Sequence, residues 1–265
     1  MTPSHFLQRG GRSLAVYSGG AGGVPLVFQH GLCGDANQIA EAMAGLGGQI
    51  WHGVECPGHG ASPMASPSIA EFAEDVIALI ETLQAPVVLG GISMGAAIAS
   101  RIAVRRPDLV RALVLVRPAW VTDAAPANMA PNAEVGALLA RHSAAEARAI
   151  FRQSTTAQRL AKDAPDNLAS LMGFFNRPDQ AATARLLTAI SADGPGITVD
   201  DLRALRVPTL ICATEEDAIH PAAHAQALAD FIAQARLRHL PAKGRDKPAH
   251  LAALATAITQ FLKEI

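Results

Sequence analysis

A serine between two glycines is the residue best placed to do chemistry in this chain. Residues 91–95 read Gly-Ile-Ser-Met-Gly, after the apolar run 86–90 and before the helical pattern of 96–103. A serine at such a strand–turn–helix bend is held in a sharp, strained conformation with its hydroxyl exposed, and the glycines let the strand and helix pack closely. The start of the helix adds N–H groups and a positive dipole end near the hydroxyl. We therefore predict that Ser93 is a nucleophile.

A nucleophilic serine needs a base, an acid that orients the base, and donors for the oxyanion that forms. Three acidic residues, Glu215, Glu216 and Asp217, follow a buried apolar run, and all three fit by spacing alone. We favour Asp217, because Ile219 and Pro221 pin the turn that follows it back into the fold. A carboxylate at the carboxyl end of a parallel strand faces the same edge as Ser93.

The expected base is His250, the only histidine beyond the last predicted strand, 237–240, and at the head of the last predicted helix, 251–262. The expected oxyanion donors are backbone N–H groups. One is that of Met94, directly after the nucleophile, and the other is that of Leu32 in a glycine-containing turn. The sequence thus supplies its candidates in the order nucleophile, acid, histidine.

Short apolar strand candidates alternate with helical patterns along most of the chain. The expected strands are 6–8, 13–17, 24–29, 50–54, 87–90, 110–116, 207–213 and 237–240. The expected helices outside residues 119–201 are 37–46, 68–83, 96–106, one following Pro221, and 251–262. This alternation predicts an α/β fold with a mostly parallel sheet and helices on both faces.

The alternation breaks between about residues 119 and 202. This segment contains helical patterns over 133–153 and 168–190 but no convincing strand. We predict a core formed by 1–118 and 202–265, and a helical cap, 119–201, over the carboxyl edge of the sheet.

Composition excludes several classes of function. The 265 residues carry a net charge of −1, which gives no electrostatic case for binding nucleic acid or an anionic membrane surface. No apolar run approaches the roughly 18–20 residues that span a bilayer, and the amino terminus lacks a secretory pattern. Cys33, Cys56 and Cys212 are odd in number and far apart. We therefore expect a cytoplasmic protein without a disulfide framework.

Together these residues resemble the α/β-hydrolase family outside the predicted cap. The resemblance rests on the turn at His30-Gly31, the loop 55–60, the bend at Ser93, the Asp217 loop and a carboxyl-terminal histidine. It implies a serine hydrolase of the small capped type, which acts on a carboxylic ester or lactone with no cofactor and no metal. The family's usual Gly-His aligns with Gly244-Arg245, and we expect a longer loop to bring His250 to Ser93 instead.

Several further residues invite a functional interpretation. Arg117 ends a predicted strand and could bind a substrate carboxylate or pair with a cap carboxylate, while Trp120 could wall the pocket or pack the cap hinge. Cys33 is expected to line the pocket as a small side chain. His220 and His224 have the i, i+4 spacing of a metal pair, but no third ligand accompanies them, so we expect no metal site.

Two alternatives to an ester hydrolase remain open. A carbon–carbon bond hydrolase of the same fold would need the cap pocket to bind an acidic dienol, for which Arg117 is the only hint. A non-catalytic module that senses a ligand through the cap is favoured only by the late position of His250. The expected partner in each case is a small molecule, and the sequence leaves the oligomeric state undetermined.

Overall fold

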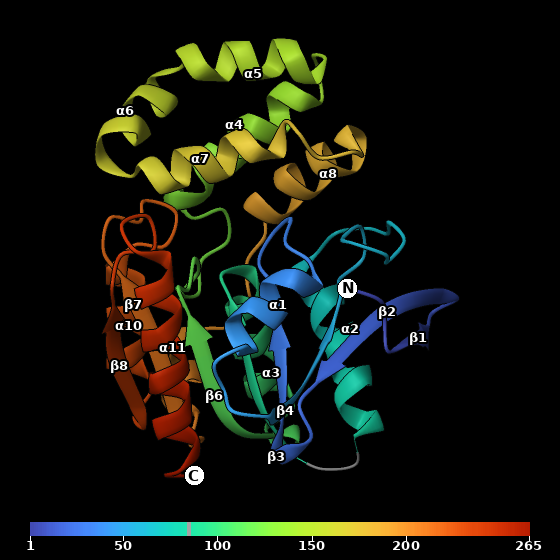
Figure 1. Ribbon diagram of the computed structural model, residues 1–265, viewed down its shortest axis with the longest axis vertical. Helices are drawn as coiled ribbons and strands as arrows, with labels where there is room; N and C mark the ends of the chain where they lie inside the picture. Colours follow the sequence, from blue (N-terminus) through green and yellow to red (C-terminus); the bar gives the residue numbers. More distant parts are fainter. Residues whose placement is uncertain (84–85) are drawn as a thin grey trace.

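A computed structural model describes residues 1–83 and 86–265, which form an eight-stranded sheet flanked by helices (Figure 1). The strands are β1 (His5–Arg9), β2 (Arg12–Gly19), β3 (Gly22–Gln29), β4 (Gln49–Val54), β5 (Val87–Ile92), β6 (Val110–Val116), β7 (Thr209–Thr214) and β8 (Ala235–Leu240). Their spatial order is β1-β2-β4-β3-β5-β6-β7-β8. Each expected strand is present, and β6 has the predicted bounds.

The sheet is antiparallel at one side and parallel over the rest. β1 and β2 form a hairpin around Gly10 and Gly11, and β2 pairs antiparallel with β4. All the pairs from β4 to β8 are parallel. The predicted α/β class with a mostly parallel sheet is therefore confirmed. Because parallel strands end at one edge, the loops after β3, β5, β6 and β7 meet there.

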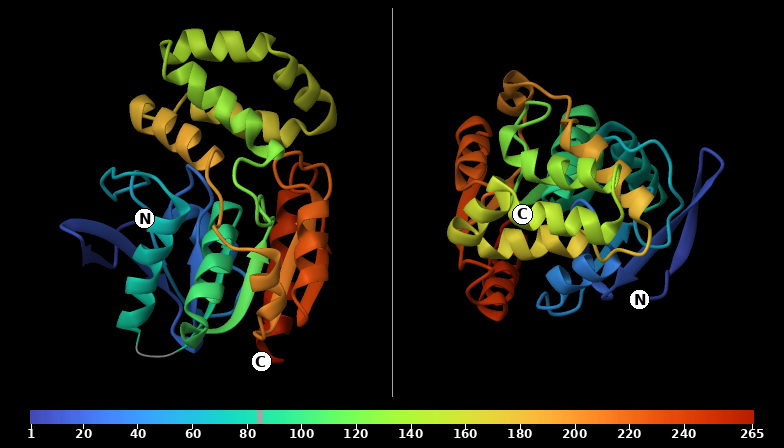
Figure 2. Two further views of the ribbon diagram at one scale, coloured as in Figure 1. Left: turned by 180° about the vertical axis from the view of Figure 1, so that it is seen from behind. Right: turned by 90° about the horizontal axis from the view of Figure 1, so that it is seen from above.

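Helices cover both faces of the sheet (Figure 2). They are α1 (Ala36–Met43), α2 (Ile69–Thr82), α3 (Met94–Arg105), α9 (Val199–Ala204), α10 (Ala222–Phe231) and α11 (Lys247–Leu262). Successive strand residues alternate between the faces. Leu89 and Leu113 pack in the apolar cluster with α2, α3 and α10, whereas Val88 and Val114 pack with α1 and α11.

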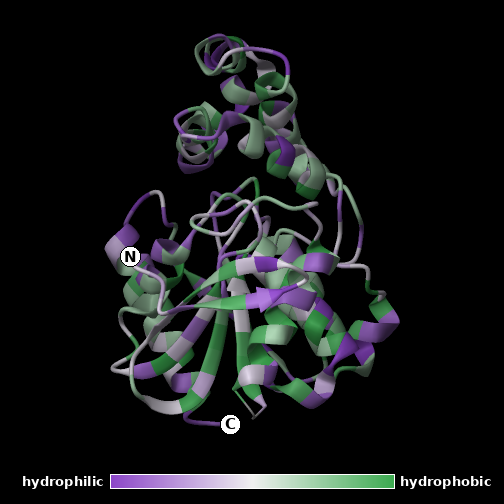
Figure 3. Cartoon of the chain, turned by 90° about the vertical axis from the view of Figure 1, so that its right-hand side faces the viewer, coloured by the Kyte–Doolittle hydropathy of each residue, from purple (hydrophilic) through white to green (hydrophobic). Residues whose placement is uncertain are grey.

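Six α-helices, α4–α9, lie between β6 and β7 in the chain, and the first five of them lie over the edge of the sheet (Figure 1). These five are α4 (Ala130–Leu139), α5 (Ala144–Gln153), α6 (Thr155–Asp163), α7 (Pro165–Phe174) and α8 (Gln180–Ser191). We call α4–α8 the inserted helices; they form a layer of their own above the sheet edge (Figure 3). α9 belongs with the core, since Arg203 lies over the ring of Phe231 in α10.

Each of the two long helices predicted in this segment is in fact divided. The first breaks at Ser143, whose hydroxyl accepts from the Glu146 N–H while Glu146 accepts from the Ser143 N–H. The second breaks before Asp179, whose carboxylate accepts from the Ala182 N–H. Both breaks are made by helix caps, which start a new helix in the middle of an apolar periodic pattern.

The bend between β5 and α3 depends on glycine at both flanking positions. Ser93 has φ 58° and ψ −111°, a strained combination for a residue with a side chain. A Cβ on Gly91 would lie 2.4 Å from the carbonyl carbon of Gly95, and one on Gly95 would lie 2.3 Å from the Gln29 oxygen. The Ser93 N–H donates to the Val116 carbonyl at 3.0 Å, which ties the bend to β6.

Replacement of Gly91 by alanine should disrupt this bend. We expect Gly91→Ala to lower the free energy of unfolding by at least about 2 kcal/mol, since backbone atoms cannot yield to the added methyl group. Gly173→Ala is the control, because a Cβ on Gly173 meets nothing within 4 Å and lies in a helix. Urea denaturation of both variants measures the difference, and equal stability of Gly91→Ala and the wild type would contradict the packing described.

Candidate active site

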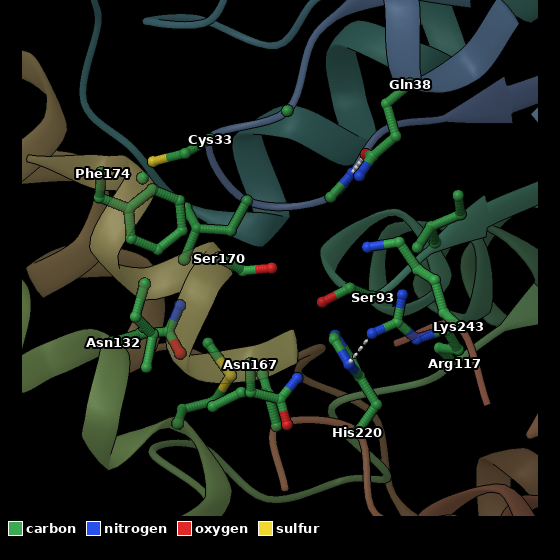
Figure 4. Close-up of a pocket in the computed structure, with 18 of the residues that line it drawn as sticks. Cys33, Gln38, Ser93, Arg117, Asn132, Asn167, Ser170, Phe174, His220 and Lys243 are labelled. Atoms are coloured by element: carbon green, nitrogen blue, oxygen red, sulfur yellow. Dashed lines mark hydrogen bonds between the residues drawn. The ribbon is translucent and has the colours of Figure 1, made fainter. Parts of the chain in front are cut away.

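A cavity of about 370 Å³ lies at the carboxyl edge of the sheet, beneath the inserted helices. The core contributes Ser93, Leu32, Arg117 and His220 to its lining. The facing wall comes from α4 and α7, through Asn132, Asn167, Ser170, Leu171 and Phe174, and from Met129 directly before α4. Figure 4 shows the Ser93 hydroxyl and the His220 ring pointing into this cavity. The pocket therefore brings a strained serine and an imidazole to one space.

Two backbone N–H groups beside Ser93 are free to bind an oxyanion. Among residues 1–83 and 86–265, neither the Leu32 nor the Met94 N–H donates to another protein group. The neighbouring Gly31 N–H is held by Gln38, whose Oε1 accepts it at 2.6 Å. Leu32 lines the cavity and Met94 directly follows Ser93 in the chain, and their role as oxyanion donors stays a prediction.

A pair of neighbouring histidines supports the turn that carries Leu32. His59 Nε2 accepts from the Cys33 N–H at 3.0 Å, and His30 Nε2 accepts from the Cys56 N–H at 3.1 Å. Their ring centroids lie 4.6 Å apart. Burial holds the pKa of His59 well below its usual range, so the ring stays neutral and Nε2 remains an acceptor. These histidines position the backbone and are shut off from the pocket.

Cys33 lines the cavity, as expected, but has no nucleophilic character. Burial raises the pKa of its thiol to about 12, against a smaller lowering by the Arg177 charge. Only the thiolate is a strong nucleophile. The Cys33 carbonyl accepts a hydrogen bond from Arg177, between α7 and α8, so the inserted helices touch the same turn that carries Leu32.

Asp217 is buried behind Arg117, Asn167 and His220, which line the cavity, and both of its carboxylate oxygens accept hydrogen bonds. Arg117 Nε lies 2.7 Å from Oδ2, and Asn167 Nδ2 and the His220 N–H each donate to Oδ1 at 3.0 Å. Burial alone would raise the pKa of this carboxyl group. The charge and hydrogen bond of His220, together with Arg117 and Asn167, outweigh burial and lower the pKa below its usual value. Asp217 is therefore an ionised acceptor.

His220 faces Asp217 through one ring nitrogen. Its Nδ1 lies 2.9 Å from both carboxylate oxygens. An ionised carboxylate only accepts hydrogen bonds, so Nδ1 carries a ring proton, and Nε2 is the unprotonated nitrogen whenever the ring is neutral. Burial lowers the pKa of His220, Asp217 opposes the shift, and Arg117 at 3.2 Å from Nδ1 adds to it.

The structure does not bring His250 into this cavity. α11 begins at Lys247, earlier than predicted, because Asp246 caps it by accepting from the Ala249 N–H at 2.9 Å. His250 therefore sits in the first helical turn, where its Nδ1 contacts the Pro241 carbonyl at 3.0 Å and its ring lines a smaller neighbouring cavity. Arg245, at the position of the family's usual histidine, is exposed and pairs with Glu216.

Arg117 and Trp120, the other two candidate substrate contacts, both bind protein groups through their side-chain N–H groups. Arg117 lines the cavity, but its guanidinium is engaged with Asp217 and leaves little for a substrate carboxylate. Trp120 is buried outside the cavity lining, and its Nε1 donates to the Asp193 carbonyl at 2.9 Å. This hydrogen bond connects the segment before α4 with the segment after α8. Trp120 therefore packs at the hinge of the inserted helices, the second of the two roles considered for it above.

Sequence reasoning missed His220 and Asn167 as members of the site. His220 was noted only for its spacing to His224, whose Nδ1 instead contacts the Ala119 carbonyl at 3.2 Å. The usable signal was its place three residues after Asp217, in the same loop. Asn167 carried no signal, because its contact with Asp217 spans 50 residues. Within the described ranges, no cluster of three or more His, Cys, Asp or Glu could hold a metal ion.

A family model described as "Alpha/beta hydrolase family" matches residues 20–257. Among curated proteins, the chain is 29% identical over 194 residues to a pimeloyl-[acyl-carrier protein] methyl ester esterase of Chromobacterium violaceum, covering 72% of this chain and 74% of the relative. It is 35% identical over 126 residues to the sn-1-specific diacylglycerol lipase ABHD11 of Mus musculus, covering 46% of this chain and 39% of the relative. The latter match spans well under half of the relative's length.

Among solved structures, the chain is similar to the enol-lactonase from Burkholderia xenovorans LB400. The TM-score is 0.71 at 23% identity, and the match covers 97% of this chain and 99% of the other. A likeness at this identity shows the shared fold. No helix among residues 1–83 and 86–265 has the length and apolar character to cross a bilayer.

The Arg117–Asp217 pair should be important for stability. Arg117→Met leaves a buried carboxylate without its guanidinium, and we expect the free energy of unfolding to fall by about 3 kcal/mol. Arg106→Met is the control, because Arg106 pairs with Glu81 and Asp108 at the surface, where water screens the charges. Denaturant unfolding at pH 7 measures the free energy of unfolding of both variants. If Arg117→Met loses as little stability as Arg106→Met, the Arg117–Asp217 pair does not have the stabilising role described.

Proposed function

This chain belongs to the α/β-hydrolase family, and from that premise we propose that it is a serine hydrolase that cleaves small or medium carboxylic esters or lactones. Ser93 is the nucleophile, His220 the general base and Asp217 the acid that orients it. The observation that carries the proposal is a single pocket holding the strained Ser93 and a His220 ring whose Nδ1 faces an ionised Asp217.

In the first half-reaction, Ser93 Oγ attacks the substrate carbonyl carbon while His220 Nε2 accepts the hydroxyl proton. Asp217 holds the imidazolium that forms. The carbonyl oxygen becomes an oxyanion and accepts from the Leu32 and Met94 N–H groups, which have no other acceptor in the described ranges. The imidazolium then gives its proton to the leaving alkoxide, and the alcohol departs from an acyl-enzyme on Ser93.

In the second half-reaction, water replaces the alcohol. His220 Nε2 accepts one water proton as the oxygen attacks the acyl carbon, and the same two N–H groups bind the second oxyanion. Collapse breaks the bond to Ser93 Oγ, which recovers its proton from His220. The products are a carboxylic acid and an alcohol, or one hydroxy acid when the substrate is a lactone.

We propose that the inserted helices, which lie within the predicted segment 119–201, act as a cap domain, because α4 and α7 form the wall of the pocket opposite Ser93. The apolar part of this wall, Met129, Leu171 and Phe174, suits an acyl or alkyl group of modest size. The esterase name of the curated relative and the enol-lactonase name of the solved structure support an ester or lactone. We also propose a cytoplasmic location, on the ground of three free, buried cysteines.

The carbon–carbon hydrolase alternative loses its one hint, because Arg117 is committed to Asp217 rather than open to an acidic dienol. One observation favours a second function, a non-catalytic ligand-binding protein. Arg245 stands at the position of the family's usual histidine and lies outside the pocket. In that case the pocket would bind an ester without turning it over.

Covalent labelling with a fluorophosphonate, read by intact mass, tests the assignment of the base. We expect one adduct per wild-type chain, none in Ser93→Ala, and a labelling rate about 10³-fold lower in His220→Ala. His250→Gln should label within about threefold of the wild-type rate, because His250 touches Pro241 rather than the pocket. Loss of labelling in His250→Gln with retention in His220→Ala would reverse the assignment, and an unlabelled wild type would favour the ligand-binding function.

The pH dependence of ester hydrolysis should follow His220. A general base acts in its neutral form, and burial lowers the pKa of His220 from the ordinary 6.5. We therefore expect kcat/KM to stay constant down to a pH below 6.5 and to fall at lower pH. Lys243→Met should move this acid limb upward slightly, because the Lys243 charge contributes to the lowering. A wild-type midpoint above 6.5 would count against His220 as the base.

A further inference from the structure

The first turn of α7 reaches from the inserted helices down to the floor of the pocket. Asn167 is only 3% exposed and uses both ends of its amide. Its Nδ2 donates to Asp217 Oδ1 at 3.0 Å, and its Oδ1 accepts from the Ala218 N–H at 2.6 Å. One side chain thus holds both the carboxylate and the peptide group that follows it.

The two carboxylate oxygens of Asp217 are divided between different elements. Oδ2 receives Arg117 from the end of β6, whereas Oδ1 receives Asn167 from α7 and the backbone N–H of His220. His220 Nδ1 lies 2.9 Å from both oxygens. The rotation of the carboxylate about its Cβ–Cγ bond is therefore fixed from the core on one side and from the inserted helices on the other. That rotation sets where the imidazole points.

The neighbouring residue fixes α7 against a second loop. Asp166 Oδ2 lies 3.4 Å from Lys243 Nζ, in the connection between β8 and α11. A Cβ on Gly244 would lie 2.7 Å from the Asp166 Cβ, so the helix and loop approach closely. Two consecutive residues of α7 therefore contact the loops that follow β7 and β8.

We propose that Asn167 is a positioning residue of this active site, which acts through Asp217 on the orientation of His220. The inserted helices then do more than wall the pocket. They supply part of the hydrogen-bond frame of the acid, and the frame is complete only while α7 is docked on the Asp217 loop. This inference rests on the proposed function of Asp217 and His220.

Two variants of Asn167 distinguish a role in positioning Asp217 and His220 from a role in binding the substrate, and also test the effect of an added carboxyl group. Asn167→Ala removes both hydrogen bonds, so we expect kcat to fall by about 10-fold or more while KM stays within about twofold. Asn167→Asp keeps the shape but replaces the donor by a second carboxylate beside Asp217. Two carboxyl groups about 3 Å apart do not both ionise readily, so the pair keeps a proton to higher pH and favours the imidazolium once both are ionised. The acid limb of kcat/KM should therefore move up by about one pH unit.

Asn176→Ala is the matched control, because Asn176 follows α7, is exposed and contacts only Arg148 among side chains of the described ranges. It should leave kcat, KM and the pH profile unchanged. The assays use the full chain with p-nitrophenyl butyrate, after circular dichroism has established that each variant is folded. A rise in KM at unchanged kcat in Asn167→Ala would make Asn167 a substrate contact and overturn the proposal, as would an unmoved pH profile in Asn167→Asp.

Nitrogen-15 NMR of the His220 ring gives a readout that does not depend on turnover. We expect a single Nδ1–H tautomer in the wild type and in Asn176→Ala, and a mixture of tautomers in Asn167→Ala. An unchanged tautomer in Asn167→Ala would overturn the positioning role. A different result would contradict the proposed function but not the positioning role. In that result the wild type has the Nδ1–H tautomer and Asn167→Ala loses it, but the wild type neither hydrolyses esters nor reacts with the fluorophosphonate.

Discussion

The buried carboxylate of Asp217 is the group on which the arrangement of this site depends. An ionised carboxylate out of water is costly unless charges and donors compensate for it. This chain compensates with groups from three elements: Arg117 at the end of β6, Asn167 in α7 and His220 in the loop of Asp217 itself. The compensation has a chemical consequence. Because Asp217 accepts the Nδ1 proton, His220 presents an unprotonated Nε2 to the pocket that also holds Ser93. Stability and reactivity are thus properties of one cluster.

The second constraint is the bend that holds Ser93. At Gly91 and Gly95, the space that a Cβ would need is already occupied by backbone atoms of other segments. The close packing of β3, β5 and α3 therefore allows no side chain at either position. That close approach also brings the turn with Leu32 beside the start of α3, where the Met94 N–H has no acceptor among residues 1–83 and 86–265. His59 and His30 stabilise the turn from behind without entering the pocket. The same backbone packing therefore positions Ser93, the proposed nucleophile, and the two N–H donors proposed for the oxyanion.

The sequence predicted those features that arise from local periodicity and from backbone geometry. β6 has its predicted bounds, the bend at Ser93 is present and the sheet is mostly parallel, because apolar runs and glycine spacing determine these directly. The sequence did not predict those parts of the site that depend on the direction of a side chain in a loop or on tertiary packing. His250 was expected in a loop, but the cap at Asp246 starts α11 early and draws His250 into the helix. His220 lies beside Asp217 through a turn whose φ and ψ angles no pattern revealed, and Asn167 reaches Asp217 only through tertiary packing.

The most direct test of the central claim, that His220 rather than His250 serves Ser93, is a crystal structure of the wild-type fluorophosphonate adduct. We predict phosphorus bonded to Ser93 Oγ, the phosphoryl oxygen within hydrogen-bond distance of the Leu32 and Met94 N–H groups, and His220 Nε2 facing the adduct. His220 Nδ1 should remain on Asp217, and His250 should remain on the Pro241 carbonyl. An adduct whose phosphoryl group is faced by His250, with His220 turned away from Ser93, would contradict this account.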